Sequence, residues 1–258
     1  MRRVLRPAGL LVGLAMLAVL LAACGGDDDA VPAATGTALA ASPTPAPTRP
    51  TAEERSAAEP LLKAAALLAE DLPSGFTLDE EKFTTNADEA EQESSIPGAP
   101  TAEDLDRLGR ILGYQVHYAR PTPETLTGAT LDFQIETDLY RDSKGAEEHF
   151  EIIRQLQSGP EFAEAFEDEN AESQVRDVVV SPISFAKVGD DRMAFELEFK
   201  MNWPGLDTEP TFFAQLIGIR RGAGIGFITV LAAGAPHPLE ELEDLARSLD
   251  ERMKDALE

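Results

Sequence analysis

Cysteine, histidine and tryptophan are scarce in this sequence of 258 residues, which contains one cysteine, three histidines and one tryptophan. A single cysteine excludes an intramolecular disulfide. His117, His149 and His237 lack the short spacings of transition-metal ligands, so we expect no metal and no cofactor. No Gly-x-Ser-x-Gly motif is present, and nucleophilic hydrolysis therefore has no support. These absences favour a protein that is not an enzyme.

Positive charge is also scarce. The 47 Asp and Glu residues outnumber the 22 Lys and Arg residues, which gives a net charge of −25 at pH 7. Such a charge repels nucleic-acid phosphates and anionic lipid headgroups, so we expect neither as a partner surface. It keeps a protein soluble and attracts cations or basic partners.

The first 24 residues have the pattern of an export signal. Three arginines precede an uncharged apolar stretch, Ala8 to Leu21, that is too short to span a bilayer comfortably. Leu21-Ala22-Ala23-Cys24 follows and resembles the lipobox of bacterial lipoproteins. The resemblance implies cleavage before Cys24, lipid on its thiol, and attachment to the extracytoplasmic side of a membrane. An ordinary signal peptide or a short anchor helix is the alternative interpretation.

Residues 24–54 are expected to form a disordered linker after the signal peptide of residues 1–23. The segment is rich in Ala, Pro, Thr and Gly, and it contains no aromatic residue. It cannot bury enough apolar surface to offset the entropy of ordering the chain. Its prolines favour extended conformations, which would hold the following domain away from the bilayer.

Residues 55–258 are expected to form one extracytoplasmic domain. Helical spacing of apolar residues occurs in residues 61–69, 143–157, 160–168 and 239–253, whereas residues 79–106 are expected to be acidic and irregular. Strand-like alternation is clearest in residues 131–139 and 193–203, and residues 212–219 and 225–231 are apolar on both faces. The order of these elements predicts an α+β fold: a largely antiparallel sheet of about six strands, covered on one face by helices.

Four short features of this domain form a set. They are the turn Asp71-Leu72-Pro73-Ser74-Gly75-Phe76, the turn Val188-Gly189-Asp190, the hairpin Arg220-Arg221-Gly222 and the final Leu/Ala helix. Together they look like the PknH-type extracellular sensor domain and related lipoproteins of actinobacteria. The resemblance implies ligand sensing or binding at the cell surface, with a cleft beside the sheet. This chain departs from the kinase version because it lacks the disulfide cysteines and a kinase domain.

Polar residues alternate with apolar ones along the strands, and they are the most suggestive candidates for a site. If the strand pairs share one sheet, these side chains point the same way, and several carboxylates on a rigid face could bind a cation or a basic ligand. A solvated face is the more common meaning of such alternation. The candidate ligand-binding residues are His117, Asp132, Glu136, Asp138, Glu196 and Glu198.

The sequence therefore favours a membrane-anchored surface lipoprotein whose domain binds an extracytoplasmic ligand or protein without catalysis. One alternative is a cell-envelope hydrolase that uses two carboxylates of the polar face, which would have to flank a cleft about 5–10 Å apart. Another is a structural or assembly partner, which a large exposed apolar patch would favour.

Overall fold

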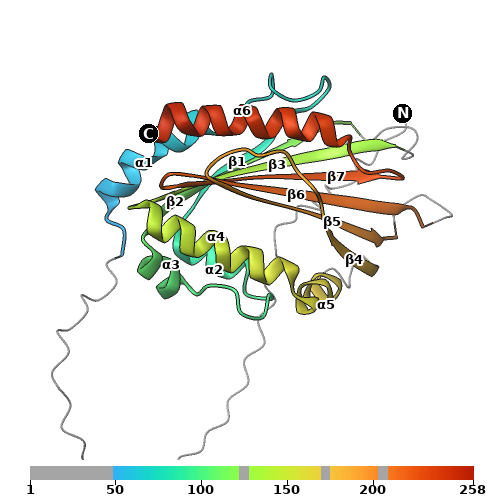
Figure 1. Ribbon diagram of the computed structural model, residues 1–258, viewed down its shortest axis with the longest axis horizontal. Coiled ribbons are helices and arrows are strands. Elements are labelled where there is room, and N and C mark those ends of the chain that lie inside the picture. Colours follow the sequence, from blue (N-terminus) through green and yellow to red (C-terminus); the bar gives the residue numbers. More distant parts are fainter. Residues whose placement is uncertain (1–48, 122–127, 170–174, 203–208) are drawn as a thin grey trace, which may run out of the picture.

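The computed structural model describes residues 49–121, 128–169, 175–202 and 209–258, and it confirms the α+β class (Figure 1). The leader, Cys24 and most of the expected linker lie outside these residues. No helix in the described ranges is both long and apolar enough to cross a membrane. The elements are α1 (Ala52–Ala65), β1 (Thr77–Thr84), α2 (Asn86–Gln92), α3 (Ala102–Leu108), β2 (Arg110–Ala119), β3 (Ala129–Tyr140), α4 (Ser143–Ser158), α5 (Pro160–Glu169), β4 (Arg176–Pro182), β5 (Asp191–Lys200), β6 (Thr211–Arg221), β7 (Gly224–Ala233) and α6 (Leu239–Leu257).

The strands form one antiparallel sheet in the order β1-β2-β3-β7-β6-β5-β4. The two halves of the sheet meet where β3 pairs with β7, so the last strand of the chain lies at the centre of the sheet. Central position explains why β7 is buried along nearly its whole length, as its apolar sequence predicted. The sheet has one strand more than the expected six, because β1 adds an edge strand next to β2.

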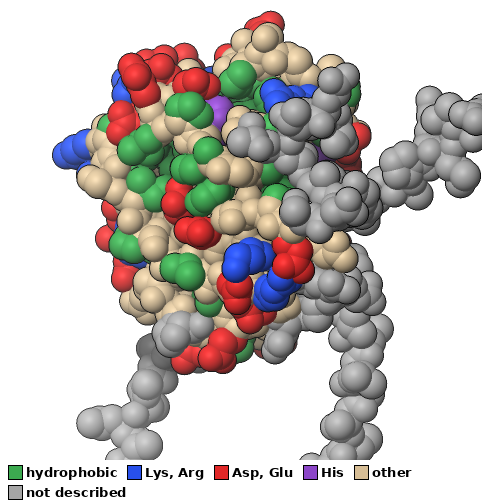
Figure 2. Space-filling model, turned by 90° about the vertical axis from the view of Figure 1, so that its right-hand side faces the viewer, with side chains coloured by type: hydrophobic (Ala, Val, Ile, Leu, Met, Phe, Trp, Pro, Cys, Tyr) green, Lys and Arg blue, Asp and Glu red, His purple; other side chains and the backbone are tan. Residues whose placement is uncertain are grey.

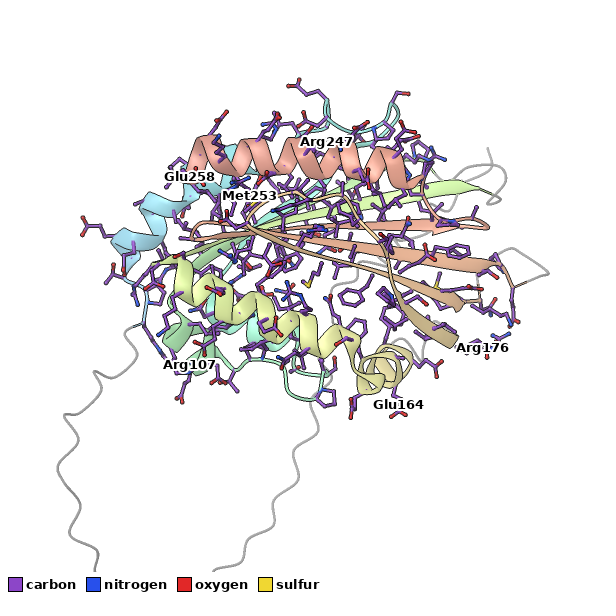
Figure 3. The ribbon with its side chains drawn as sticks, viewed as in Figure 1. Arg107, Glu164, Arg176, Arg247, Met253 and Glu258 are labelled. Atoms are coloured by element: carbon purple, nitrogen blue, oxygen red, sulfur yellow. The ribbon has the colours of Figure 1, made fainter. Side chains whose placement is uncertain are left out.

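Helices α1 and α6 pack side by side over one face of the sheet, called here the upper face (Figure 1). Leu62 of α1 and Leu242, Leu249 and Met253 of α6 are completely buried, in a cluster with Ile135, Ile217 and Ile228 from three strands. In Figure 3, Met253 lies on the side of α6 that faces the sheet. Burial of each such side chain stabilises the fold by about 1.5–3 kcal/mol.

Helices also cover the second face, called here the lower face, where the sequence predicted helices on one face alone. Helices α2 and α3 pack under β1 and β2, α4 lies under the centre of the sheet, and α5 packs against β4 (Figure 1). Two apolar clusters form there, one around Phe162, Phe199 and Phe212 and one around Tyr140, Phe150 and Ile225. The sheet is therefore the middle layer of three.

Residues 79–106 are not irregular, as predicted, but contain most of β1 and the helices α2 and α3. Each helix has seven residues, too few to show a clear apolar period. Each begins with a capping box, in which Thr85 or Thr101 exchanges hydrogen bonds with an aspartate three residues later. A third capping box at Thr51 starts α1 at Ala52, so the domain begins inside the segment that was assigned to the linker.

Candidate functional site

The polar strand residues lie on two opposite faces of the sheet. Residues that are paired across neighbouring strands project from the same face of the sheet. Asp132 of β3 pairs with Leu231 of β7, which pairs with Ala214 of β6. Ala214 in turn pairs with Leu197 of β5. Leu197 therefore shares the lower face with Asp132, and its neighbours Glu196 and Glu198 project from the upper face. The expectation that the polar side chains of both strand pairs point the same way is wrong. The apolar residues of β5 face α4 and α5, whereas those of β2 and β3 face α1 and α6.

Glu196 and Glu198 lie near the β4 edge of the upper face. Gln215 on β6 donates a hydrogen bond of 3.2 Å from Nε2 to Glu196 Oε2. Partial burial, and then the negative charge of Glu198, raise the pKa of Glu196. Two glutamates on the same strand face with one amide neighbour resemble the solvated surface of a sheet more than a binding site.

His117 and Asp132 form a small polar group on the lower face. His117 Nδ1 lies 3.2 Å from Asp79 Oδ2, and His117 Nε2 lies 4.0 Å from Asp132 Oδ2. Asp132 and Asp79 raise the pKa of His117 because each carboxylate favours the charged ring. Burial raises the pKa of Asp132. The group is a local ion pair when the ring of His117 is protonated, and the two carboxylates favour that form.

Glu136 and Asp138 are enclosed between the sheet and the helices α2 and α3, where they surround the completely buried side chain of Arg110. Arg110 Nη2 lies 2.8 Å from Asp138 Oδ1, 3.0 Å from Glu89 Oε2 and 3.9 Å from Glu136 Oε1. Asn86 and Thr84 accept further hydrogen bonds from the guanidinium. A buried charge requires this number of partners, because an unpaired one is strongly destabilising.

Several buried carboxyl groups surround the single guanidinium of Arg110 between the sheet and the helices α2 and α3. Burial, and then the negative charge of Glu89, raise the pKa of Glu93 to about 8. Burial also raises the pKa of Asp138 to about 6 and holds that of Glu136 well above its usual value. A raised pKa favours the protonated, uncharged form of a buried carboxyl group, and this lowers the excess of negative charge around Arg110. Within the described ranges no group of three or more His, Cys, Asp or Glu has the geometry of a metal site, and Arg110 occupies the position that a cation would need.

The other two histidines are also structural. Burial lowers the pKa of His149 to about 3, and its Nδ1 is hydrogen bonded to the hydroxyl of Tyr140. Burial also lowers the pKa of His237, whose Nδ1 lies 2.8 Å from Thr130 Oγ1. Both rings are therefore neutral at pH 7 and join helices or loops to β3.

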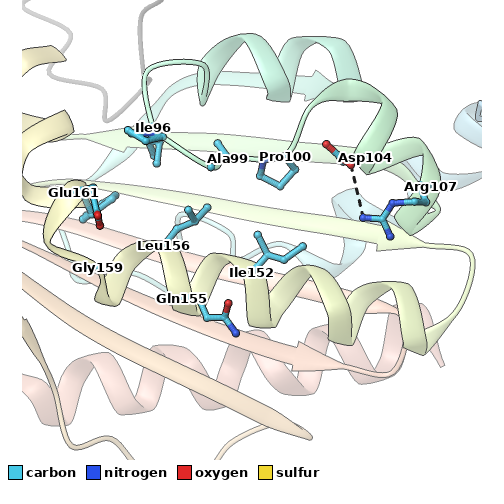
Figure 4. Close-up of a pocket in the computed structure, with 13 residues that line it drawn as sticks. Ile96, Ala99, Pro100, Asp104, Arg107, Ile152, Gln155, Leu156, Gly159 and Glu161 are labelled. Carbon is cyan, nitrogen blue, oxygen red and sulfur yellow. Dashed lines mark ion pairs between the residues drawn. The ribbon is translucent and has the colours of Figure 1, made fainter. Parts of the chain in front are cut away.

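A cleft of about 430 Å³ opens on the lower side of the molecule, between the loop that joins α2 to α3 and the helices α4 and α5 (Figure 4). The loop forms one wall with Ile96, Pro97, Gly98, Ala99 and Pro100, and α4 forms the other with Ile152, Gln155 and Leu156. Ile96 and Phe162 belong to the same apolar cluster on the lower face, the one that contains Phe199 and Phe212, and this makes the floor of the cleft apolar. The volume lies within the range of small-molecule sites, about 300–1,000 Å³.

Charged side chains stand at the two ends of this cleft (Figure 4). At one end, Arg107 Nη1 lies 2.7 Å from Glu148 Oε1, and its Nη2 lies 3.7 Å from Asp104 Oδ1. The hydroxyl and backbone amide of Thr101 lower the pKa of Asp104, which is therefore ionised. At the other end is Glu161, in the first turn of α5. The cleft thus has an apolar middle and acidic ends.

The sequence interpretation missed this cleft and included none of its residues. Its two walls are about 50 residues apart in the chain, and one of them is the segment that was expected to be irregular. A signal was present: Ile96-Pro97-Gly98-Ala99-Pro100 is an uncharged, Pro-containing run inside an otherwise acidic stretch. The two prolines restrict the backbone of this loop, and its apolar side chains favour packing against another apolar element.

No protein-family model matches the sequence, and no curated protein matches it either. Among solved structures, the chain is similar to the extracellular domain of PknH from Mycobacterium tuberculosis. The two are 8% identical in sequence with a TM-score of 0.43, and the match covers 80% of this chain and 98% of that domain.

Proposed function

We propose that the chain is an exported lipoprotein, held to a membrane by lipid on Cys24, whose α+β domain binds a small extracytoplasmic ligand without catalysis. The observation that carries the binding function is the cleft between residues 96–100 and helices α4 and α5. It combines an apolar floor with a few polar groups at its ends, which is the usual composition of a small-molecule site. The export signal and the cysteine at its end support the location.

The positions of the carboxylates support binding over hydrolysis. A glycosidase needs two carboxyl groups on either side of a bond that a substrate can reach. Glu136 and Asp138 are enclosed with Arg110, and Glu196 and Glu198 lie on the opposite face of the sheet. The carboxylates expected to act together therefore share no cleft.

The surface gives less support to a structural or assembly role. In the view of Figure 2, the hydrophobic side chains lie in small groups separated by polar and acidic ones. The exposed large hydrophobic residues of the described ranges are Leu61, Leu68, Leu78, Val179 and Leu239, which come from five separate segments. Apolar residues scattered in this way are ordinary for a soluble surface.

The binding function can be tested by filling the cleft. Ala99→Trp places a large ring in the loop wall, and Ala57→Trp on the exposed side of α1 is the matched control. The purified protein is screened for changes in melting temperature with a panel of amines, carboxylates, alcohols and sugars. We expect at least one class to stabilise the wild type and Ala57→Trp but not Ala99→Trp. Stabilisation by no class, or equal stabilisation of Ala99→Trp, would contradict the function.

The lipid anchor has a separate test. Cys24→Ala should move the protein from the membrane fraction of expressing bacteria to the soluble fraction, because the acyl chains supply the membrane affinity. Cys24→Ala protein that stays in the membrane fraction would contradict the anchor.

A further inference from the structure

The cleft is elongated and follows α4. Its helical wall runs from Ile152 through Leu156 to Gly159, which is roughly 10 Å at 1.5 Å per residue. Opposite, the loop comes close to the helix, because a Cβ atom on Gly98 would lie 3.3 Å from Leu156 Cδ2. An occupant of this space is therefore narrow and has an apolar middle.

Both ends of the cleft have an excess of negative charge. Among the described residues that line it, Arg107 is the one cation, and that charge is already matched by Glu148 and Asp104. At the other end, the carboxylate of Glu161 folds back toward the junction of α4 and α5, where Oε2 lies 3.1 Å from the position of a Cβ atom on Gly159. The described part of the chain supplies no ion pair to Glu161.

We infer that the cleft binds a linear organic cation, an aliphatic chain with an ammonium group at each end, as in diamines and polyamines. The inference rests on the proposed binding function and names its ligand class. One ammonium group pairs with Glu161, the methylene chain packs on Ile152 and Leu156, and the other ammonium group lies beside Asp104.

Electrostatics disfavours the other charge classes. A dicarboxylate would bring negative charge to Glu161 and Asp104, in a protein whose net charge is already −25. A neutral chain of the same length would gain the apolar contact, but it would leave Glu161 without a charged partner and would not offset the excess negative charge beside Asp104. The overall negative charge also raises the local concentration of cations and speeds their association.

Isothermal titration calorimetry with three eight-carbon probes tests the inference: 1,8-diaminooctane, 1,8-octanediol and suberate. The variants are Glu161→Gln at the end of the cleft and Glu164→Gln, its matched control on the same helix, which points away from the molecule in Figure 3. We expect the diamine to bind most tightly. Glu161→Gln should weaken its binding about three- to fivefold, the contribution of one partly screened charge pair, whereas Glu164→Gln should leave it unchanged.

Each other result overturns the ligand class. If the diol or suberate bound as tightly as the diamine or more tightly, the cationic ligand class would be wrong, whereas the proposed binding function would still hold. Equal weakening by Glu164→Gln would mean that only the overall charge of the protein attracts the diamine. Absence of diamine binding would reject the class, and the binding function would then depend on the panel screen with Ala99→Trp.

Discussion

The guanidinium of Arg110 lies directly against Gly113, where a Cβ atom on residue 113 would be 2.2 Å from Nη2. Gly113 faces Thr84 on one neighbouring strand and Asp138 on the other. The missing side chain leaves a channel across three strands, and Arg110 fills it. The same charged group holds α2, because Glu89 and Asn86 of that helix both contact Arg110.

Gly113→Ala should therefore destabilise the protein. The new methyl group would also come within 2.4 Å of Thr84 Oγ1 and 2.5 Å of Asp138 Oδ1, so the side chains must move apart. We expect a loss of about 1–3 kcal/mol in the free energy of unfolding by urea. In an Arg110→Ala background the same substitution should cost less, because the main clash is gone. Equal costs in the two backgrounds would show that Arg110 and Gly113 are independent.

Arg110→Met should cost about 3–5 kcal/mol, because it leaves buried carboxylates without their cation. The control is Arg247→Met on the outer side of α6, where Arg247 forms an exposed ion pair with Asp244 (Figure 3). Its effect should stay within about 0.5 kcal/mol. Urea unfolding measures both. Similar stability of the two variants would mean that Arg110 is dispensable.

The unfolding free energy should fall as the pH rises from about 6 to about 8. The raised pKa of Glu93, about 8, means that the native state retains a proton that the unfolded chain has released above its ordinary pKa of 4.5. The slope for one such proton is about 1.4 kcal/mol per pH unit. Glu93→Gln removes this titration and should flatten the dependence. An unchanged slope in Glu93→Gln would show that Glu93 is ionised in the native state.

The three histidines should titrate separately in a proton NMR experiment. His117 should have a pKa above 6.5, and Asp132→Asn should lower it because one carboxylate neighbour is lost. His149 should remain neutral down to about pH 3, because its ring is buried beside Arg110. The unfolded chain takes up a proton at this histidine below its ordinary pKa of 6.5, whereas the native state does not. The free energy of unfolding should therefore decrease as the pH falls from 6.5 towards 3. A His149 signal that titrates near pH 6.5 would place the ring in contact with solvent.

The parts of the fold that the sequence predicted are those with a long, regular apolar pattern. The alternation of β3 and the helical spacing of Leu242, Leu249 and Met253 each indicated one buried face, and the structure buries them. Helices α2 and α3 escaped notice because seven residues hold less than two full periods. Their capping boxes were visible, but a capping box shows where a helix starts and not that it continues.

The candidate site was harder to predict, because a strand pattern does not say which layer its apolar face meets. The alternation of β3 and that of β5 are equally regular, yet Ile135 packs under α1 and α6 whereas Leu197 packs over α5. The relation between the two strands depends on β6 and β7, which lie between them and are apolar on both faces. Nor does the sequence show that Arg110 is completely buried, since arginine usually lies at the surface.

The most direct test of the binding cleft is a methyl NMR titration of the purified protein with 1,8-diaminooctane. The account predicts that the methyl signals of Ile96, Ile152 and Leu156 shift together and saturate, while those of the exposed Leu61 and Leu78 stay in place. Shifts at Leu61 and Leu78 that equal or exceed those at Ile152 and Leu156 would contradict the assignment of the cleft as the binding site.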